Sequence, residues 1–150
     1  MRIFISVLVV FLFACATTAK APVASPEVRI AQTSGVPSVA RGITGSFPVR
    51  YAVRIANTAK ETITLQRITV QSLGAGAYEL PATSRPFDQT IAPESHADVE
   101  LWASAFVADP TILGANGPVT LRLTLHFESP KGEFDQVVVR QVNAASGGQS

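Results

Sequence analysis

The chain has 150 residues, of which 47% are hydrophobic, and this fraction is raised by the first 19 positions, where 15 residues are hydrophobic. The remaining stretch of about 130 residues is long enough for one domain and too short for two. Twelve Lys and Arg residues stand against eleven Asp and Glu residues, so the basic excess of a nucleic-acid-binding protein is missing. A single Cys excludes an internal disulfide bond.

Residues 1–14 have the pattern of a secretory signal peptide. Arg2 gives a short positive start, and between Ile3 and Ala14 only Ser6 is not apolar. An apolar run of this length is too short to span a hydrocarbon core of about 30 Å comfortably. The pattern therefore predicts export from the cytoplasm rather than a transmembrane helix.

Residues 12–15, Leu-Phe-Ala-Cys, resemble the lipobox of bacterial lipoproteins. In that family a dedicated peptidase cuts before the Cys after its thiol has received a diacylglycerol, and the new amino group is usually acylated as well, with palmitate as a typical chain. The resemblance implies that Cys15 is lipidated and that the membrane is a partner through this anchor. Ala16 rather than Asp follows the Cys, which in Gram-negative lipoproteins implies the outer membrane, facing the periplasm.

A second interpretation of the same region stays open. Residues 14–16 (Ala-Cys-Ala) and 19–21 (Ala-Lys-Ala) both satisfy the small-x-small rule of ordinary signal peptidase. Cleavage there would remove Cys15 and produce a soluble periplasmic or secreted protein. The position of the only Cys, where the apolar run ends, favours the lipoprotein.

Residues 15–27 are expected to hold the lipidated Cys and a flexible tether. The segment ATTAKAPVASPE contains small residues and two prolines, and it has no apolar period. A folded domain is expected over 28–142, followed by a Gly/Ser-rich disordered tail over 143–150.

Within the domain the dominant period is two residues, which predicts β-strands. Apolar and polar residues alternate most clearly over 49–56 and 119–128. The phase slips between Leu65 and Ile68, so we expect a β-bulge near Gln66. Further strands are predicted over 28–30, 77–80, 87–91, 99–107 and 134–142, with one helical turn over 109–113.

This pattern predicts an all-β protein, a single antiparallel β-sandwich that is immunoglobulin-like or fibronectin-like in outline. Roughly six to eight short strands separated by turn signals are typical of that architecture. The helix–strand alternation of nucleotide-binding α/β folds is missing.

One family resemblance covers most of the domain. The segments that carry it are Tyr51–Asn57, a strand ending in Asn, then Thr90–Pro93 with Asp98–Leu101, and a final hairpin over Val119–Val139. Their order resembles the bacterial late-embryogenesis-abundant type 2 proteins, which carry the water-stress and hypersensitive-response domain. The resemblance implies a non-catalytic role in stress protection, chaperone-like in character.

Residues suited to catalysis are sparse. His96 could bind a metal ion together with Glu94 or Asp98, but this segment has no second His or Cys at ligand spacing, so a solvated turn is the preferred interpretation. No serine has a Gly-x-Ser-x-Gly context and no glycine-rich phosphate loop is present. We therefore expect neither an enzyme nor a cofactor, and no bound metal.

Two groups of residues are candidates for partner contact. Arg50, Arg54, Arg122 and Arg140 all fall on predicted strands, and they would form one stripe if their outer faces coincide. The alternative is that they keep the sheet faces and edges soluble. The connector residues Ile112 and Leu113 either plug an end of the sandwich or meet a partner.

Two further side chains are expected to be structural. His126 lies on the polar face of its strand beside Glu128, where a cross-strand partner is expected. Trp102 and Phe106 fall on the face of the 99–107 strand opposite its apolar positions, and that face is expected to be partly covered. Because Trp102 stands among aliphatic residues, it is expected to pack in the core or against a sheet.

The sequence as a whole predicts a membrane-tethered, non-catalytic envelope lipoprotein that acts as a protein-interaction or accessory module. Its partner would be an envelope protein whose identity the sequence leaves open. Two alternatives are a stress-protective protein of the family above and a carrier of a small ligand or metal that uses His96.

Overall fold

The computed structural model of the protein describes residues 25–34, 45–74, 76–106 and 117–143. The regular structure in these ranges consists of β-strands, and no helix within them is long and apolar enough to cross a membrane. The strands are β1 (Glu27–Gln32), β2 (Ser46–Ala56), β3 (Ile63–Ser72), β4 (Thr83–Ile91), β5 (His96–Phe106), β6 (Pro118–Ser129) and β7 (Gly132–Asn143).

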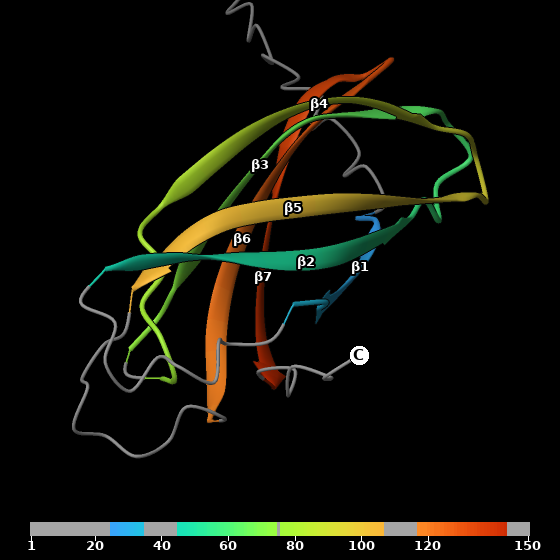
Figure 1. The fold of residues 1–150 in the computed structure, drawn as a ribbon. Coiled ribbons are helices and arrows are strands. Elements are labelled where there is room, and N and C mark those ends of the chain that lie inside the picture. Colours follow the sequence, from blue (N-terminus) through green and yellow to red (C-terminus); the bar gives the residue numbers. More distant parts are fainter. Residues whose placement is uncertain (1–24, 35–44, 75, 107–116, 144–150) are drawn as a thin grey trace, which may run out of the picture.

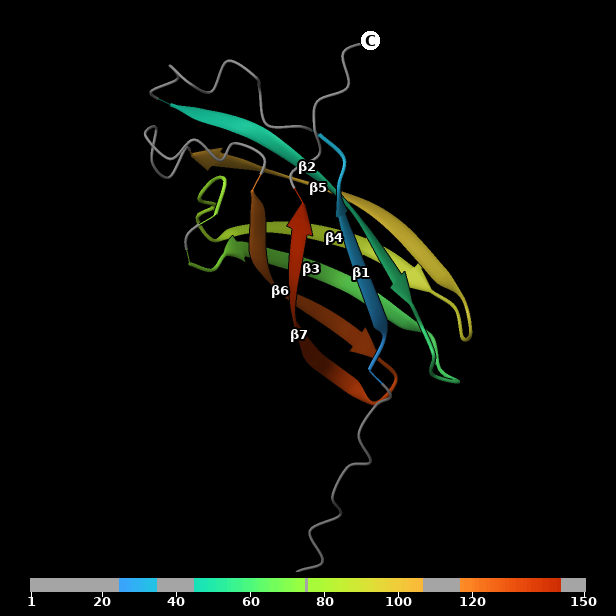
Figure 2. The same cartoon turned by 90° about the horizontal axis from the view of Figure 1, so that it is seen from below.

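The strands form two antiparallel sheets that lie face to face (Figure 1, Figure 2). Sheet A has the strand order β1-β2-β5, and sheet B has the order β4-β3-β6-β7. The chain changes sheets after β2, after β4 and after β5. The predicted all-β fold class, an antiparallel β-sandwich, is therefore confirmed.

The sandwich has two ends, which we name by their position along sheet A. At the entry end Glu27, Ala56 and His96 stand side by side on the three strands. At the far end Ser46 pairs with Phe106. The described chain thus enters β1 at one end, and β5 finishes at the other.

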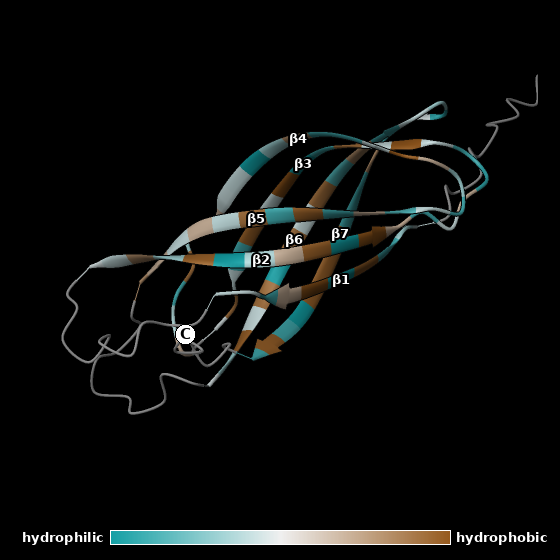
Figure 3. Ribbon diagram, turned by 45° about the vertical axis from the view of Figure 1, so that its right-hand side comes forward, coloured by the Kyte–Doolittle hydropathy of each residue, from teal (hydrophilic) through white to brown (hydrophobic). Residues whose placement is uncertain are grey.

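The alternation of apolar and polar residues explains why the two sheets pack together. Every second residue of β2 from Phe47 to Ile55 is buried, and so is every second residue of β6 from Val119 to Phe127. Figure 3 shows hydrophobic residues (brown) alternating with hydrophilic residues (teal) along these strands. Burial of each such aliphatic side chain contributes about 1.5–3 kcal/mol to folding.

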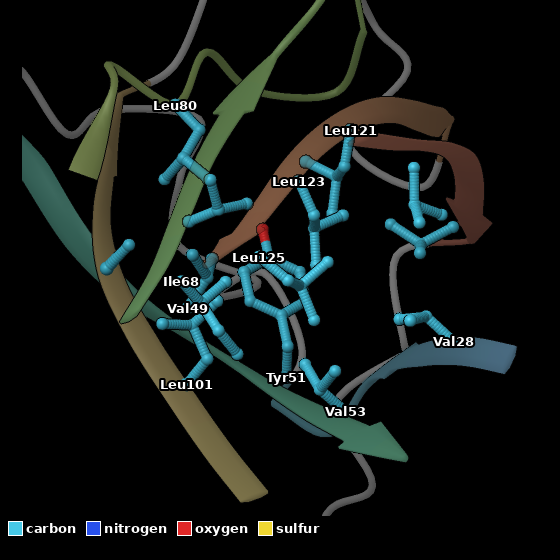
Figure 4. Close-up of a cluster of buried hydrophobic side chains, with 14 of the residues drawn as sticks. Val28, Val49, Tyr51, Val53, Ile68, Leu80, Leu101, Leu121, Leu123 and Leu125 are labelled. Atoms are coloured by element: carbon cyan, nitrogen blue, oxygen red, sulfur yellow. The ribbon is translucent and has the colours of Figure 1, made fainter. Parts of the chain in front are cut away.

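Side chains from both sheets meet between the layers (Figure 4). Val49 and Leu101 of sheet A lie in the same buried cluster as Ile68 and Leu125 of sheet B, and all four are fully buried. The core is thus shared by strands that are distant in the sequence, so neither sheet has a core of its own.

The predicted β-bulge is confirmed. The register of β3 shifts between Leu65 and Arg67 against both β4 and β6. Gln66 and Arg67 are both exposed, so the buried positions resume at Ile68. The extra residue lets Leu65 and Ile68 face the same core, although three positions separate them.

The structure differs from the sequence prediction at 77–80. This segment is a loop rather than a strand, and its contact with β5 is an isolated bridge between Glu79 and Phe106. Tyr78 and Leu80 are nevertheless buried, because the loop folds over the far end of the core. The predicted helical turn at 109–113 lies outside the described residues.

Candidate functional site

The arginines of the predicted stripe do not lie on one face. Arg50 and Arg54 are on the outer face of sheet A, whereas Arg122 is on the outer face of sheet B. Arg140 shares the strand phase of Val138, whose side chain is turned toward the core. The condition for a continuous basic stripe is therefore not met.

The two arginines of β2 pair with acids on β5. Arg54 makes a bidentate contact with Asp98, with Nε–Oδ1 and Nη2–Oδ2 distances of 2.7 and 2.9 Å. Arg50 Nη1 lies 3.2 Å from Glu100 Oε1. The hydrogen bonds from Arg54 lower the pKa of the Asp98 carboxyl. Exposed pairs of this kind contribute little to stability. In the register of β2 with β5, Arg54 lies directly opposite Asp98, and Glu100 is two residues along β5 from the residue opposite Arg50.

Trp102 is on the surface, which corrects the expectation that it packs in the core or against a sheet. Its side chain is 51% exposed on the outer face of β5, and Phe106 on the same face is 44% exposed. The reason is strand phase, because the neighbours Leu101 and Ala103 occupy the core-facing positions. That phase was readable from the sequence.

An arginine from the opposite sheet holds Trp102 in place. The Arg85 guanidinium of β4 lies 3.6 Å from the centroid of the Trp102 ring, within range of a cation–π interaction. Arg85 Nε also donates a hydrogen bond to the backbone oxygen of Trp102 at 3.3 Å. The two residues therefore link the neighbouring edges of the two sheets.

These residues define what we call the Trp102 surface. It consists of Arg85, Trp102, Ser104 and Phe106, together with the exposed Pro48, which pairs with Ser104. Apart from Arg85, which comes from β4, these residues lie on the far-end half of the outer face of sheet A. Sequence reasoning missed Arg85, because no local pattern indicates that β4 and β5 lie side by side.

A chain of buried hydrogen bonds supports the same end from within. The Tyr51 hydroxyl lies 2.7 Å from the Tyr78 hydroxyl, which donates to Gln32 Oε1 at 2.7 Å. Gln32 Nε2 then donates to the backbone oxygen of Ser34. Tyr78 also meets Phe47 edge-on, with ring centroids 6.0 Å apart. The 76–82 loop is thereby fixed to sheet A.

Burial raises the pKa of both tyrosine hydroxyls. For Tyr51 the causes are desolvation first, then the hydrogen bond to Tyr78. For Tyr78 desolvation raises the pKa, and the hydrogen bond from Tyr51 partly opposes it. The Tyr51 hydroxyl is therefore the donor in the bond between them, because Tyr78 already donates to Gln32.

Asn57 organises the entry end. It is 1% exposed, and its Nδ2 donates to the backbone oxygens of Glu61, Ile91 and Ala92 at 2.8, 3.1 and 3.1 Å. Its Oδ1 accepts from the backbone nitrogen of Ala59 at 3.0 Å. One side chain thus connects the crossover after β2 to the crossover after β4.

His96 lies at the rim of an open depression of about 360 Å³ at the entry end, together with Glu94 and Asn57. Asp98 is held by Arg54, which removes it from any ligand set with His96. Across the described ranges, no group of three or more His, Cys, Asp and Glu residues is arranged to hold a metal ion.

His126 has the cross-strand partner that the sequence led us to expect. Its Nδ1 lies 2.6 Å from Asp135 Oδ1, and the two residues are directly opposed on β6 and β7. The remaining candidates, Cys15, Ile112 and Leu113, lie outside the described residues. The strands that precede and follow Ile112 and Leu113, β5 and β6, finish and begin at the far end.

No family model matches the chain, and no curated protein matches it. Solved structures do share its fold. A Northeast Structural Genomics Consortium target, SoR45, aligns with a TM-score of 0.54 at 12% identity, covering 81% of this chain and 86% of its own. A protein from Archaeoglobus fulgidus aligns with a TM-score of 0.51 at 11% identity, covering 83% of this chain and all of its own. At these identities the likeness shows the β-sandwich fold alone.

Proposed function

We propose that the protein is a membrane-tethered, non-catalytic envelope lipoprotein that acts as a protein-interaction module, with the Trp102 surface as its contact. The observation that carries the proposal is the half-exposed Trp102 ring held under Arg85. Trp and Arg are the residue types most enriched among those that dominate binding energy at protein interfaces.

The Trp102 surface has the features of a preformed contact. Exposed aromatic side chains grouped on one face often mark interaction sites. Arg85 restricts the Trp102 ring before any partner arrives, which lowers the conformational entropy that binding would cost. The polar residues Ser104 and Arg50 beside the aromatic rings provide hydrogen-bonding groups at the rim.

The location of the surface is compatible with a tether at the amino terminus. Pro26, near the start of the described chain, is held at the entry end by a 2.7 Å hydrogen bond from Gln136 Nε2. Phe106 and Trp102 lie toward the other end of sheet A. A lipid on Cys15 would therefore be attached to the end of the domain that is remote from the contact.

The test is site-specific photocrosslinking of the full chain in a bacterial envelope. A photoreactive amino acid replaces Ser104, which lies between Trp102 and Phe106. The matched control replaces the exposed Thr90 of β4, on the outer face of sheet B. We expect a discrete adduct with an envelope protein from position 104 and none from position 90. Equal adducts from both positions, or none from either, would contradict the proposal.

A substitution of Trp102 then tests whether the adduct from position 104 depends on the Trp102 ring. Trp102→Ala is expected to reduce the yield of the adduct by about tenfold or more, as for a central interface residue. Val137→Ala serves as the control, because Val137 is also 51% exposed but lies on sheet B. An adduct that survives Trp102→Ala undiminished would show that the Trp102 surface is not the contact.

A further inference from the structure

Within the described residues, β7 is the final strand, and its outer edge presents backbone groups that no neighbouring strand bonds. Leu73 donates its backbone N–H to the backbone oxygen of Thr120, so the even-numbered residues of β6 bond toward β3. Antiparallel ladders alternate, so the odd-numbered residues of β6 bond to the even-numbered residues of β7. The backbone groups of Val137, Val139 and Gln141 therefore point away from sheet B.

The three other sheet edges are blocked. On β5, Glu79 exchanges two backbone hydrogen bonds with Phe106, and Arg85 bonds the oxygen of Trp102. On β4, Pro86 interrupts the edge, and β1 has only six residues. Prolines, short edge strands and covered edges are the devices by which natural sheets avoid pairing with another chain.

Among the described residues, no strand or loop is hydrogen-bonded to the backbone of the outer edge of β7, and the one protective device there is the charge of Arg140, which has the core-facing phase of Val138. The 12 residues of β7 include neither Pro nor Lys, and they contain three consecutive valines. Val137 and Val139 are 51% and 47% exposed on the outer face. Among the described residues, the side-chain bond that occupies a backbone group of this edge runs from the exposed Arg140 Nη1 to the neighbouring oxygen of Val139 at 3.0 Å. Gln136 Nε2 also donates to the backbone oxygen of Pro26 at 2.7 Å, but this bond uses no backbone group of β7.

We propose that β7 pairs with β7 of a second copy of this chain, antiparallel and centred on Val138, so that two four-stranded sheets become one continuous sheet. Each Val137 then lies opposite Val139 of the second copy, and four half-exposed valines cover one another. Asp135 lies opposite Gln141 and Gln136 opposite Arg140, so no like charges meet.

Neighbouring registers are less favourable. Centring the pair on Val137 sets Val139 against Asp135, and centring it on Val139 sets Val137 against Gln141. Centring it on Arg140 places two guanidinium groups opposite each other. The valines and the charges of β7 therefore select the same register, which is the complementarity expected of a two-fold contact between identical surfaces.

The test is crosslinking of the full chain in membranes. Val137→Cys is treated with a short bismaleimide, and Ala52→Cys on the exposed outer face of sheet A is the control. The parent chain, which carries only Cys15, gives the background. We expect a product of twice the chain mass from Val137→Cys alone.

A pair of charge variants tests the register. Gln141→Glu sets a carboxylate against Asp135 of the second copy and should lower the yield of the dimer, by about threefold to tenfold. Gln141→Lys sets an ammonium there and should keep or raise the yield. Gln141 is exposed, so both variants should retain the β-sheet circular dichroism of the parent.

Three outcomes would overturn the proposal. They are a dimer yield from Val137→Cys no greater than from Ala52→Cys, an adduct whose mass shows a different protein, and equal effects of the two Gln141 variants. None of them bears on the adduct from position 104, so this inference fails or stands separately from the proposed function.

Discussion

At each end of the sandwich, buried polar side chains hold the connecting segments in place through hydrogen bonds. Asn57 at the entry end and the Tyr51–Tyr78 pair at the far end are buried polar groups with their hydrogen bonds satisfied. Such groups are costly to leave unpaired and therefore fix the connections that they join. Removal of the Asn57 side chain, or ionisation of the two tyrosines, should therefore destabilise the fold.

Removal of the Asn57 side chain should destabilise the domain strongly. In Asn57→Ala the backbone oxygens of Ile91 and Ala92 and the backbone nitrogen of Ala59 lose their partner. We expect a loss of about 3 kcal/mol in the free energy of unfolding, measured by urea denaturation. Thr58→Ala, a change at the exposed neighbour, should cost little, and equal costs for the two variants would contradict the role assigned to Asn57.

The two tyrosines should report alkaline unfolding. In an unfolded chain each hydroxyl has its ordinary pKa of 10.0, and in the fold both pKa values are raised by burial. The neutral hydroxyls therefore stabilise the fold fully below pH 10.0, and this contribution is lost as the pH rises above that value. Because the chain has only these two tyrosines, tyrosinate absorbance should appear together with loss of β-sheet circular dichroism.

The outcome that would contradict this prediction is a tyrosinate titration completed near pH 10.0 while the circular dichroism stays native. Tyr78→Phe provides a control, because it should halve the amplitude of the absorbance change. Its transition should still coincide with unfolding, since Tyr51 remains fully buried.

At the scale of elements, the β-bulge in β3 decides which side chains face the core. Ile63 and Leu65 precede the bulge and Ile68 and Val70 follow it, and all four are buried. Without the extra residue, one of these pairs would turn to solvent, because a slip of one position reverses the faces of a strand.

Deletion of Gln66 should therefore unfold the domain or nearly do so. Exposure of two aliphatic side chains costs about 3–6 kcal/mol, which is comparable to the whole stability of a small domain. Gln66→Ala is the matched control and should be tolerated, since Gln66 is exposed and its one side-chain bond, to Glu128, is on the surface. Circular dichroism and thermal unfolding would compare the two variants. A deletion variant as stable as Gln66→Ala would contradict the prediction.

For the whole molecule, the proposed anchor determines where the Trp102 surface operates. If Cys15 is lipidated, each buried methylene contributes about 0.8 kcal/mol to membrane binding, and two or more chains make residence stable. The domain then needs no basic face for attachment, which agrees with its balanced charge and with the pairing of Arg50 and Arg54 with acids.

The anchor can be tested by the intact mass of the processed protein from an envelope fraction. We expect a chain that begins at Cys15 and carries the mass of its acyl groups. Cys15→Ser should lose this mass, with the protein left as uncut precursor or released from the membrane. An unmodified chain that begins at Thr17 or later would instead establish soluble export.

Local patterns were sufficient to predict much of the fold. Strict alternation over 49–56 and 119–128 requires strands with one buried face, and the phase slip after Leu65 requires an extra residue there. The same phase places Trp102 outside, although its chemistry suggested the core. Periodicity was therefore a better guide to burial than residue type.

What the sequence determined by itself was which residues share a face of each strand, because side chains alternate strictly along an extended backbone. Only the tertiary structure decided which strands become neighbours, since alternation carries no information about pairing partners. That pairing separates Arg122 from Arg50 and Arg54, brings Arg85 onto Trp102, and joins Tyr51 to Tyr78. The Trp102 surface and the outer edge of β7 therefore exist only once the two sheets have formed.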